Sequence, residues 1–260
     1  MEIVMVRRGR RAVRVSGLVG GVLAAGVVLS GCGSANADDA TPEHKTFSLK
    51  GKELTVDSDN SKIELVPGGS GKDVKVTRWF DGWATGGSAG VTWRMEGDTL
   101  TLRMNCKGLT VGCDAKHRIE VPRGVAVTVK DDNGAVTAHG FDTALKITSK
   151  NGSVDVNDAK GPVDLKTTNG SLSAKGLDSQ QVSAVTKNGQ IRLGLNRVPD
   201  SVRTDSDNGA TTITLPRAPY KVDATSHNGQ VKVDVPRDDA SRHTVSARSE
   251  NGSIQVRTAD

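Results

Sequence analysis

Aromatic residues are scarce in this chain of 260 residues. It has three tryptophans, three phenylalanines and one tyrosine, which together make up 3% of the sequence. Large rings supply much of the buried surface in most protein cores. Their scarcity therefore favours a thin interior, filled by Val, Ile, Leu and Ala with short Ser and Thr side chains.

The chain also lacks the sequence motifs of common catalytic centres. It has no lipase-type serine elbow, zinc-type His-Glu helix motif, phosphate loop or Cys-x-x-Cys pair. Its histidines are dispersed along the sequence, at His44, His117, His139, His227 and His243. We expect a non-enzymatic protein with no catalytic residues, no metal and no cofactor.

Excess positive charge is confined to the beginning of the chain. The whole sequence has 35 basic and 30 acidic residues, hence +5, but residues 1–31 alone contain five arginines and one glutamate. The remainder has 30 basic and 29 acidic residues, hence +1. The basic balance is therefore poor support for a nucleic-acid partner, and we expect none.

The abundant feature is a repeat built around the pair Asn-Gly. The pairs are Asn133-Gly134, Asn151-Gly152, Asn169-Gly170, Asn188-Gly189, Asn208-Gly209, Asn228-Gly229 and Asn251-Gly252. Successive asparagines are 18, 18, 19, 20, 20 and 23 residues apart. A period of this size indicates a repeat architecture.

Each unit alternates apolar and other residues on both sides of its Asn-Gly pair. In the unit of Asn169, for example, Val163 and Leu165 come before the pair, and Leu172 and Ala174 follow it. Alternation with a period of two is typical of half-buried strands. The position two before Asn is Asp131 in the first unit and Ser or Thr in the others. We expect this residue and the Asn to point inward, and the Gly to adopt a positive φ.

An eighth unit without glycine precedes the others. Leu54, Val56, Ser58, Asn60, Ile63 and Leu65 match the template, and Ser61 replaces the glycine. Asn-Gly between strands also marks hairpins, which would give an antiparallel β-sandwich. We favour an all-β, single-stranded β-solenoid, similar to a β-helix, with coils of about 18–23 residues. Stacked coils explain why like residues recur at like positions, and their corners could carry a ladder of asparagine amides.

The first 31 residues are typical of an export signal. Arg7 to Arg14 are rich in arginine, and an apolar stretch from Val15 to Leu29 follows. Its end, Leu29-Ser30-Gly31-Cys32, resembles the lipobox of bacterial lipoproteins. The resemblance implies cleavage before Cys32 and lipidation of its thiol by a diacylglyceryl group, with palmitate as a typical acyl chain. The alternative is a plain secretory signal with an incidental cysteine.

These features predict the organisation of the chain. Residues 1–31 form the lipoprotein signal peptide, residues 32–45 the lipidated cysteine and a flexible linker, and residues 46–260 one domain. We expect the protein to lie outside the cytoplasm, lipid-anchored to the cell membrane. In that oxidising space Cys106 and Cys113 are expected to form a disulfide. A metal site or a redox pair is the alternative.

Residues 67–124 interrupt the repeat, and regular repeats resume over residues 125–258. We expect the interruption to form irregular, wider coils at the N-terminal end, with a tight turn at Gly97-Asp98. It holds Trp79, Phe80, Trp83 and Trp93, which we interpret as a candidate binding loop. Alternatively, these rings fill the end of the solenoid as an apolar plug.

The repeat units, the segment Glu96-Gly97-Asp98-Thr99-Leu100 and the segment Val121-Pro122-Arg123-Gly124 resemble the bacterial putative-adhesin family over roughly residues 50 to 258. The resemblance implies a β-solenoid-like domain, often exported or membrane-attached, and adhesin-like without a defined ligand. It carries over no functional residues.

We therefore expect a lipid-anchored, adhesin-like binding or scaffold module of the cell envelope, whose partner is a cell-wall glycan or an envelope protein. An accessory sensor of envelope stress, working with a membrane partner, is the second hypothesis. A polysaccharide-active β-helix enzyme is the third. In that case surface carboxylates would act together, and Asp205 and Asp223 are expected on neighbouring coils.

Overall fold

The computed structural model describes residues 36–259. These residues form one short 3-10 helix, η1 (Ala37–Asp39), and nineteen β-strands in one continuous hydrogen-bonded array. No helix among them has the length and apolarity needed to cross a membrane. The predicted signal peptide and Cys32 lie outside the described residues.

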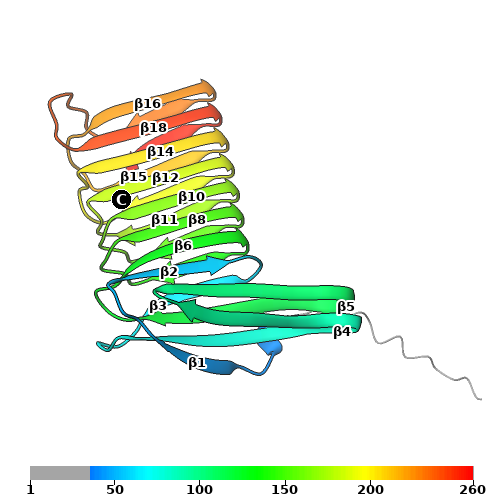
Figure 1. Cartoon of the computed structure of the whole chain (residues 1–260). Coiled ribbons are helices and arrows are strands. Elements are labelled where there is room, and N and C mark those ends of the chain that lie inside the picture. The colour runs from blue at the N-terminus through cyan, green and yellow to red at the C-terminus, as the bar shows by residue number, and fades with distance from the viewer. Residues whose placement is uncertain (1–35, 260) are drawn as a thin grey trace, which may run out of the picture. The chain divides into compact units, whose positions relative to one another are not determined.

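Eight coils stack in parallel, and each has two strands joined by a corner (Figure 1). The coils are β2 (Glu53–Ser58) with β3 (Lys62–Pro67), β6 (Ala126–Asn133) with β7 (Val136–His139), β8 (Leu145–Asn151) with β9 (Val154–Asn157), β10 (Val163–Asn169) with β11 (Leu172–Leu177), β12 (Gln181–Asn188) with β13 (Ile191–Leu195), β14 (Ser201–Asn208) with β15 (Thr211–Leu215), β16 (Lys221–Asn228) with β17 (Val231–Asp234), and β18 (Thr244–Asn251) with β19 (Ile254–Thr258).

The register confirms the solenoid, because like positions of successive units lie side by side. Leu165 pairs with Ile147 on one side and Ala184 on the other, and Asn169 pairs with Asn151 and Asn188. The Gly-less unit belongs to the same stack, since Leu54 pairs with Val127. The antiparallel sandwich is therefore wrong. The two stacked sheets enclose one continuous apolar core of mostly aliphatic residues.

The asparagines form the expected ladder along one edge of the stack. The side-chain amide of Asn151 donates to Asn133 at 2.8 Å, that of Asn169 donates to Asn151 at 2.8 Å, and the series runs from Asn60 to the last coil. The asparagines are exposed, however, while the Ser or Thr two residues earlier is mostly buried. The inward orientation expected for Asn is therefore wrong. In the ladder, amide groups are satisfied by each other at the surface.

The corner glycines are required by close packing, and the expectation of a positive φ is mostly wrong. Of the seven, only Gly189 and Gly209 have a positive φ, at 158° and 143°. A Cβ at Gly152 would lie 1.8 Å from the carbonyl oxygen of Gly134, and the other corner glycines face the next coil in the same way. Ser61 is tolerated because it stands at the first coil, where this column of corners begins.

The last two coils stack out of sequence order. Strand β18 pairs with β14 on one side and β16 on the other, so the final coil lies between the two coils that precede it in the chain (Figure 1). The connection at residues 235–243 provides the length for this return. Asp205 of β14 therefore pairs with Arg248 of β18, and β18 separates it from Asp223 of β16. The expectation that Asp205 and Asp223 lie on neighbouring coils is wrong.

Residues 67–124 are mainly two long antiparallel strands, β4 (Asp73–Glu96) and β5 (Thr99–Val121), and the expectation of irregular coils is wrong. The expected tight turn at Gly97-Asp98 joins them, since Glu96 pairs with Thr99. Residues 99–102 of β5 pair with β2, and residues 116–121 pair with β3. Strand β1 (Glu43–Ser48) pairs with β4 and covers this end of the second sheet.

Candidate functional site

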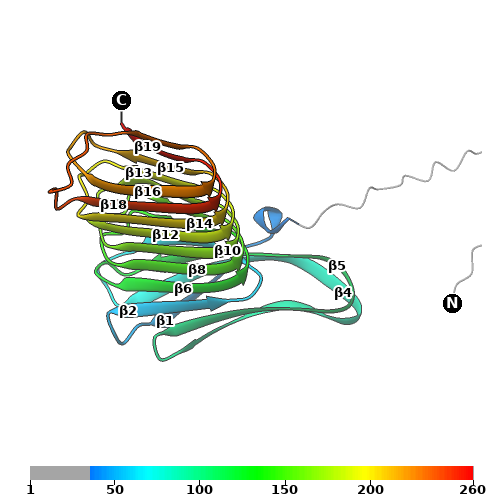
Figure 2. The ribbon, with the colours of Figure 1, turned by 90° about the horizontal axis from the view of Figure 1, so that it is seen from above.

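The middle of the β4–β5 ribbon forms an arm that leaves the stack (Figure 2). We define the arm as residues 79–91 of β4 and 103–115 of β5. Residues 99–102 of β5 pair with β2, and residues 116–121 pair with β3, so the two ends of β5 lie beside the two strands of the first coil. Residues 103–115 connect these ends and therefore lie beside the corner of that coil. The arm therefore projects from the edge that carries the asparagine ladder.

Trp93 lies at the base of the arm and packs against the core. The guanidinium carbon of Arg78 is 4.4 Å from the centre of its ring, and Arg78 donates to Glu43 at 2.7 Å. The ring of His117 meets Trp93 edge-on, with 6.4 Å between the ring centres. Burial lowers the pKa of His117 to about 4, with a smaller contribution from Arg78, so this histidine is neutral at neutral pH. Trp93 therefore matches the plug interpretation.

Trp79 and Phe80 are half-buried along the arm. The ammonium group of Lys116 lies 5.4 Å from the centre of the Trp79 ring, within the range of a cation–π contact. Phe80 lies against the backbone near Gly82, where an added Cβ would be 3.0 Å from the Phe80 ring. These two rings support the arm, and neither is fully open to a partner.

Trp83 differs from the other three aromatic residues because 58% of it is exposed. Leu109 and Val111 of β5 are 79% and 52% exposed. Trp83 pairs directly with Val111, and Thr85 pairs with Leu109, so the three apolar side chains share one face of the ribbon. We call Trp83, Leu109 and Val111 the arm tip. Among the four predicted aromatics, only Trp83 belongs to it.

Leu109 and Val111 were not among the predicted binding residues. The sequence does carry a signal for them, since the segment Gly108-Leu109-Thr110-Val111-Gly112 alternates in the way a strand does. Its position between two cysteines suggests a loop instead. The pairing across the ribbon, which brings this segment beside Trp83, is not visible in the linear sequence.

A bend and a disulfide fix the shape of the arm tip. Cys106 and Cys113 form the expected disulfide, which closes the segment that contains Leu109 and Val111. Gly86 and Gly108 have φ values of 65° and 89°, which favour glycine. An added Cβ at Gly87 would lie 1.8 Å from the carbonyl oxygen of Lys107. The two strands thus approach too closely at the bend for larger residues.

The first described residues are attached to the arm close to its tip. The backbone N–H of Asn36 donates to Asp81 at 3.0 Å, and that of Ala37 donates to Asp114 at 3.1 Å. Lys116 donates to Asp38 at 2.7 Å, which lowers the pKa of Asp38. Asp81 is two residues from Trp83. The chain therefore reaches the folded domain beside the exposed apolar patch.

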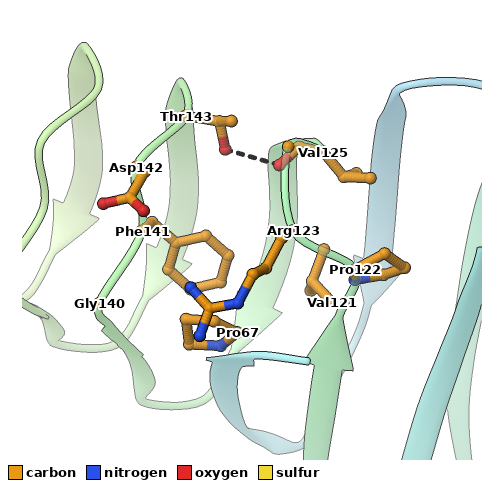
Figure 3. A pocket seen from close by; sticks show the side chains of 10 residues that line it. Pro67, Val121, Pro122, Arg123, Val125, Gly140, Phe141, Asp142 and Thr143 are labelled. Carbon is orange, nitrogen blue, oxygen red and sulfur yellow. Dashed lines mark hydrogen bonds between the residues drawn. The ribbon is translucent and has the colours of Figure 1, made fainter. Parts of the chain in front are cut away.

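The surface of the stack carries a depression of about 450 Å³, which is lined by residues such as Lys146, Asp164 and Arg203. One pocket lies at the edge opposite the ladder, between Pro67, Arg123 and Phe141 (Figure 3). Thr143 donates to the carbonyl oxygen of Val125 at 2.6 Å across its rim. Its volume of about 20 Å³ suits roughly one water molecule. Residues 36–259 contain no cluster of three or more His, Cys, Asp or Glu that could hold a metal ion.

Comparisons with known proteins agree with this architecture. The family Toastrack DUF4097 matches residues 96–260. A solved "putative adhesin" from Bacteroides fragilis has 13% sequence identity, covers 84% of this chain and 97% of its own, and superposes with a TM-score of 0.51. A "putative adhesin" from Parabacteroides distasonis has 11% identity, covers 84% and 98%, and has a TM-score of 0.45. No curated protein sequence matches the chain. At these identities, the Bacteroides structure supports the fold alone.

Proposed function

Because the chain belongs to the Toastrack DUF4097 family, we propose that it is a non-enzymatic, adhesin-like interaction module of the bacterial cell envelope, lipid-anchored through Cys32. The single observation that carries this proposal is the arm tip. Three large apolar side chains share one exposed face, on a part of the fold that projects from the stack. An exposed apolar cluster of this kind marks an interaction site.

The stack itself supports a role in binding or scaffolding. Its interior is filled by aliphatic side chains, and its outer surface carries many ion pairs, such as Lys146 with Asp164 at 3.6 Å and Lys150 with Asp132 at 2.7 Å. Solvated pairs of this kind contribute little to stability. The stack acts as the rigid support, and the arm provides the contact to a cell-wall glycan or an envelope protein.

The proposal is tested by binding of the purified full-length protein to an isolated envelope fraction. We expect Trp83→Ser to reduce binding several-fold, because it removes the largest apolar surface of the arm tip. The matched control is Lys166→Ser, an exposed position on the face of β10, which should bind as the wild type does. Equal binding by all three proteins would contradict the proposed role of the arm.

The anchor is tested separately by the mass of the N-terminal peptide of the membrane-extracted protein. A diacylglyceryl group on Cys32 is the expected result, and Cys32→Ser should abolish it. An unmodified thiol on the wild-type protein would overturn the lipid attachment and would leave the test of the arm intact.

A further inference from the structure

We propose that the arm tip inserts into the headgroup region of the same phospholipid membrane that holds the lipid anchor. This inference rests on the proposed lipidation of Cys32 and assigns a partner to the arm. The membrane is then contacted at two points, the acyl chains on Cys32 and the side chains of Trp83, Leu109 and Val111.

The composition of the arm tip matches a membrane interface. Residues 83–88 and 107–112 contain Trp83, Leu109 and Val111, with glycines and short hydroxyl residues between them. Lys107 is the one charged residue in these two segments, and they contain no carboxylate. Tryptophan with aliphatic neighbours and a lysine suits the boundary between acyl chains and anionic headgroups.

The same composition is a poor match for a glycan. Sugar-binding sites present flat aromatic faces together with polar groups that fix the orientation of the ligand. Here Leu109 is the most exposed of the three apolar side chains, at 79%, and Trp83 is the only ring beside it. Aliphatic side chains that are this exposed gain most from a partner that is itself apolar.

The position of the chain's entry into the fold brings the arm tip near the anchor. Asn36 is held by Asp81, and Trp83 lies two residues further along β4, about 7 Å at the rise of a strand. Cys32 precedes Asn36 by four residues, a connection that spans at most about 14 Å when fully extended. A lipid on Cys32 therefore keeps the arm tip within roughly 30 Å of the membrane surface.

Bonds near Asp81 and Asp114 hold the first described residues against the arm. Besides the contacts of Asn36 and Ala37, Lys62 donates to Asp114 at 2.9 Å, which raises the pKa of Lys62. The Cys106–Cys113 disulfide holds the tip itself. The arm can thus fix the orientation of the solenoid at the membrane, which a flexible lipid tether cannot do alone.

Bromolipid quenching of tryptophan fluorescence tests this inference. The lipidated full-length protein is reconstituted into vesicles of phosphatidylcholine and phosphatidylglycerol, with or without brominated acyl chains. We expect the brominated vesicles to reduce the emission of the wild-type protein. Trp83→Phe removes the reporter and should abolish most of that reduction, whereas Trp79→Phe should retain it.

A second variant removes apolar surface from the arm tip and keeps the fluorescent reporter. Leu109→Ser combined with Val111→Ser keeps Trp83 and should lose most of the quenching, because the tip is then less apolar. Unquenched Trp83 emission in the lipidated wild-type protein, together with ready quenching by aqueous acrylamide, would overturn the inference. If envelope binding still depends on Trp83 in that case, the proposed function stands and the arm contacts a protein or a glycan.

The mass of the Cys32 peptide is measured in the same preparation. A missing lipid would overturn both the anchor and this inference. Absence of quenching with the lipid present would overturn the inference alone.

Discussion

Asp131 is the one carboxylate in the buried column of residues two before each Asn. It pairs with Ser58 on one side and Ser149 on the other, and it is 4% exposed. Burial raises its pKa to about 7 from 3.8, and the hydroxyl of Ser58 opposes this shift only in part. Above pH 7 the folded protein therefore buries a charge that the unfolded chain leaves in water.

We expect Asp131→Ser to stabilise the protein in a pH-dependent manner. A raised pKa in the folded state means that stability falls as the pH rises from about 4 to about 7, by an amount on the order of 4 kcal/mol. Serine fills this position in other coils and has no such cost. Denaturant unfolding should show a small difference from wild type at pH 4 and a large one at pH 7.5. A difference that does not vary with pH would contradict this account.

His117 shifts stability in the opposite direction. Its pKa falls from 6.5 to about 4 in the folded protein, so stability is full above pH 6.5 and falls as the pH drops toward 4. In the wild type the two groups offset one another over this range. In Asp131→Ser the contribution of His117 should become visible as stability that rises from pH 4 to 6.5.

Gly152 has no space for a side chain. An alanine Cβ would lie 1.8 Å from the carbonyl oxygen of Gly134, so the two coils would have to separate. We expect Gly152→Ala to lower the free energy of unfolding by about 3 kcal/mol or more. Gly69→Ala is the matched control, because nothing lies within 4 Å of its added Cβ. Equal stability of the two variants would show that the glycine column is not tightly packed.

At the scale of the element, the arm is expected to be held together locally by its disulfide. The Cys106–Cys113 bond closes a short segment, and the chain-entropy relation gives about 2.5 kcal/mol for a ring of this size. Cys106→Ser with Cys113→Ser should therefore expose Lys107 to trypsin while the melting temperature of the solenoid changes little. Loss of the whole fold would contradict this separation between arm and stack.

The sequence predicts the regular elements well because their information is local. The alternation around each Asn-Gly pair marks both strands, and the recurrence of the unit, down to the Gly-less copy at Asn60, indicates that like positions stack. The arm could not be predicted in the same way. Its shape depends on pairing between residues such as Trp83 and Val111, which are far apart in the sequence. Glycine is also found both where the backbone needs a positive φ and where two backbones approach closely. The sequence pattern around Asn-Gly does not distinguish these two reasons.

At the scale of the whole molecule, the order of the coils departs from the order of the chain. Similar repeats can stack in either order, because β16 and β18 have the same alternation of inward and outward residues and either could pair with β14. The long connection at residues 235–243 permits the return, and Thr244 donates to the carbonyl oxygen of Asp200 at 3.3 Å, which ties the last coil to β14. In the sequence, this long connection is seen as the spacing of 23 residues between Asn228 and Asn251.

Engineered disulfides test the order of the coils. Arg203 lies beside Ser246, whereas Asp223 is one coil further away. Neighbouring strands are about 4.8 Å apart and alternate ones about twice that distance. Arg203→Cys with Ser246→Cys should crosslink on mild oxidation, and Arg203→Cys with Asp223→Cys should not. The reverse result would mean that the coils stack in sequence order.

Site-specific photo-crosslinking in living cells tests directly whether the arm tip contacts the cell envelope. Benzoylphenylalanine is placed at Leu109, which is 79% exposed, and for comparison at Lys166 on the face of β10. We expect abundant adducts with an envelope component, phospholipid above all, at Leu109 and few of them at Lys166. Equally weak labelling at both positions would contradict the proposed role of the arm tip.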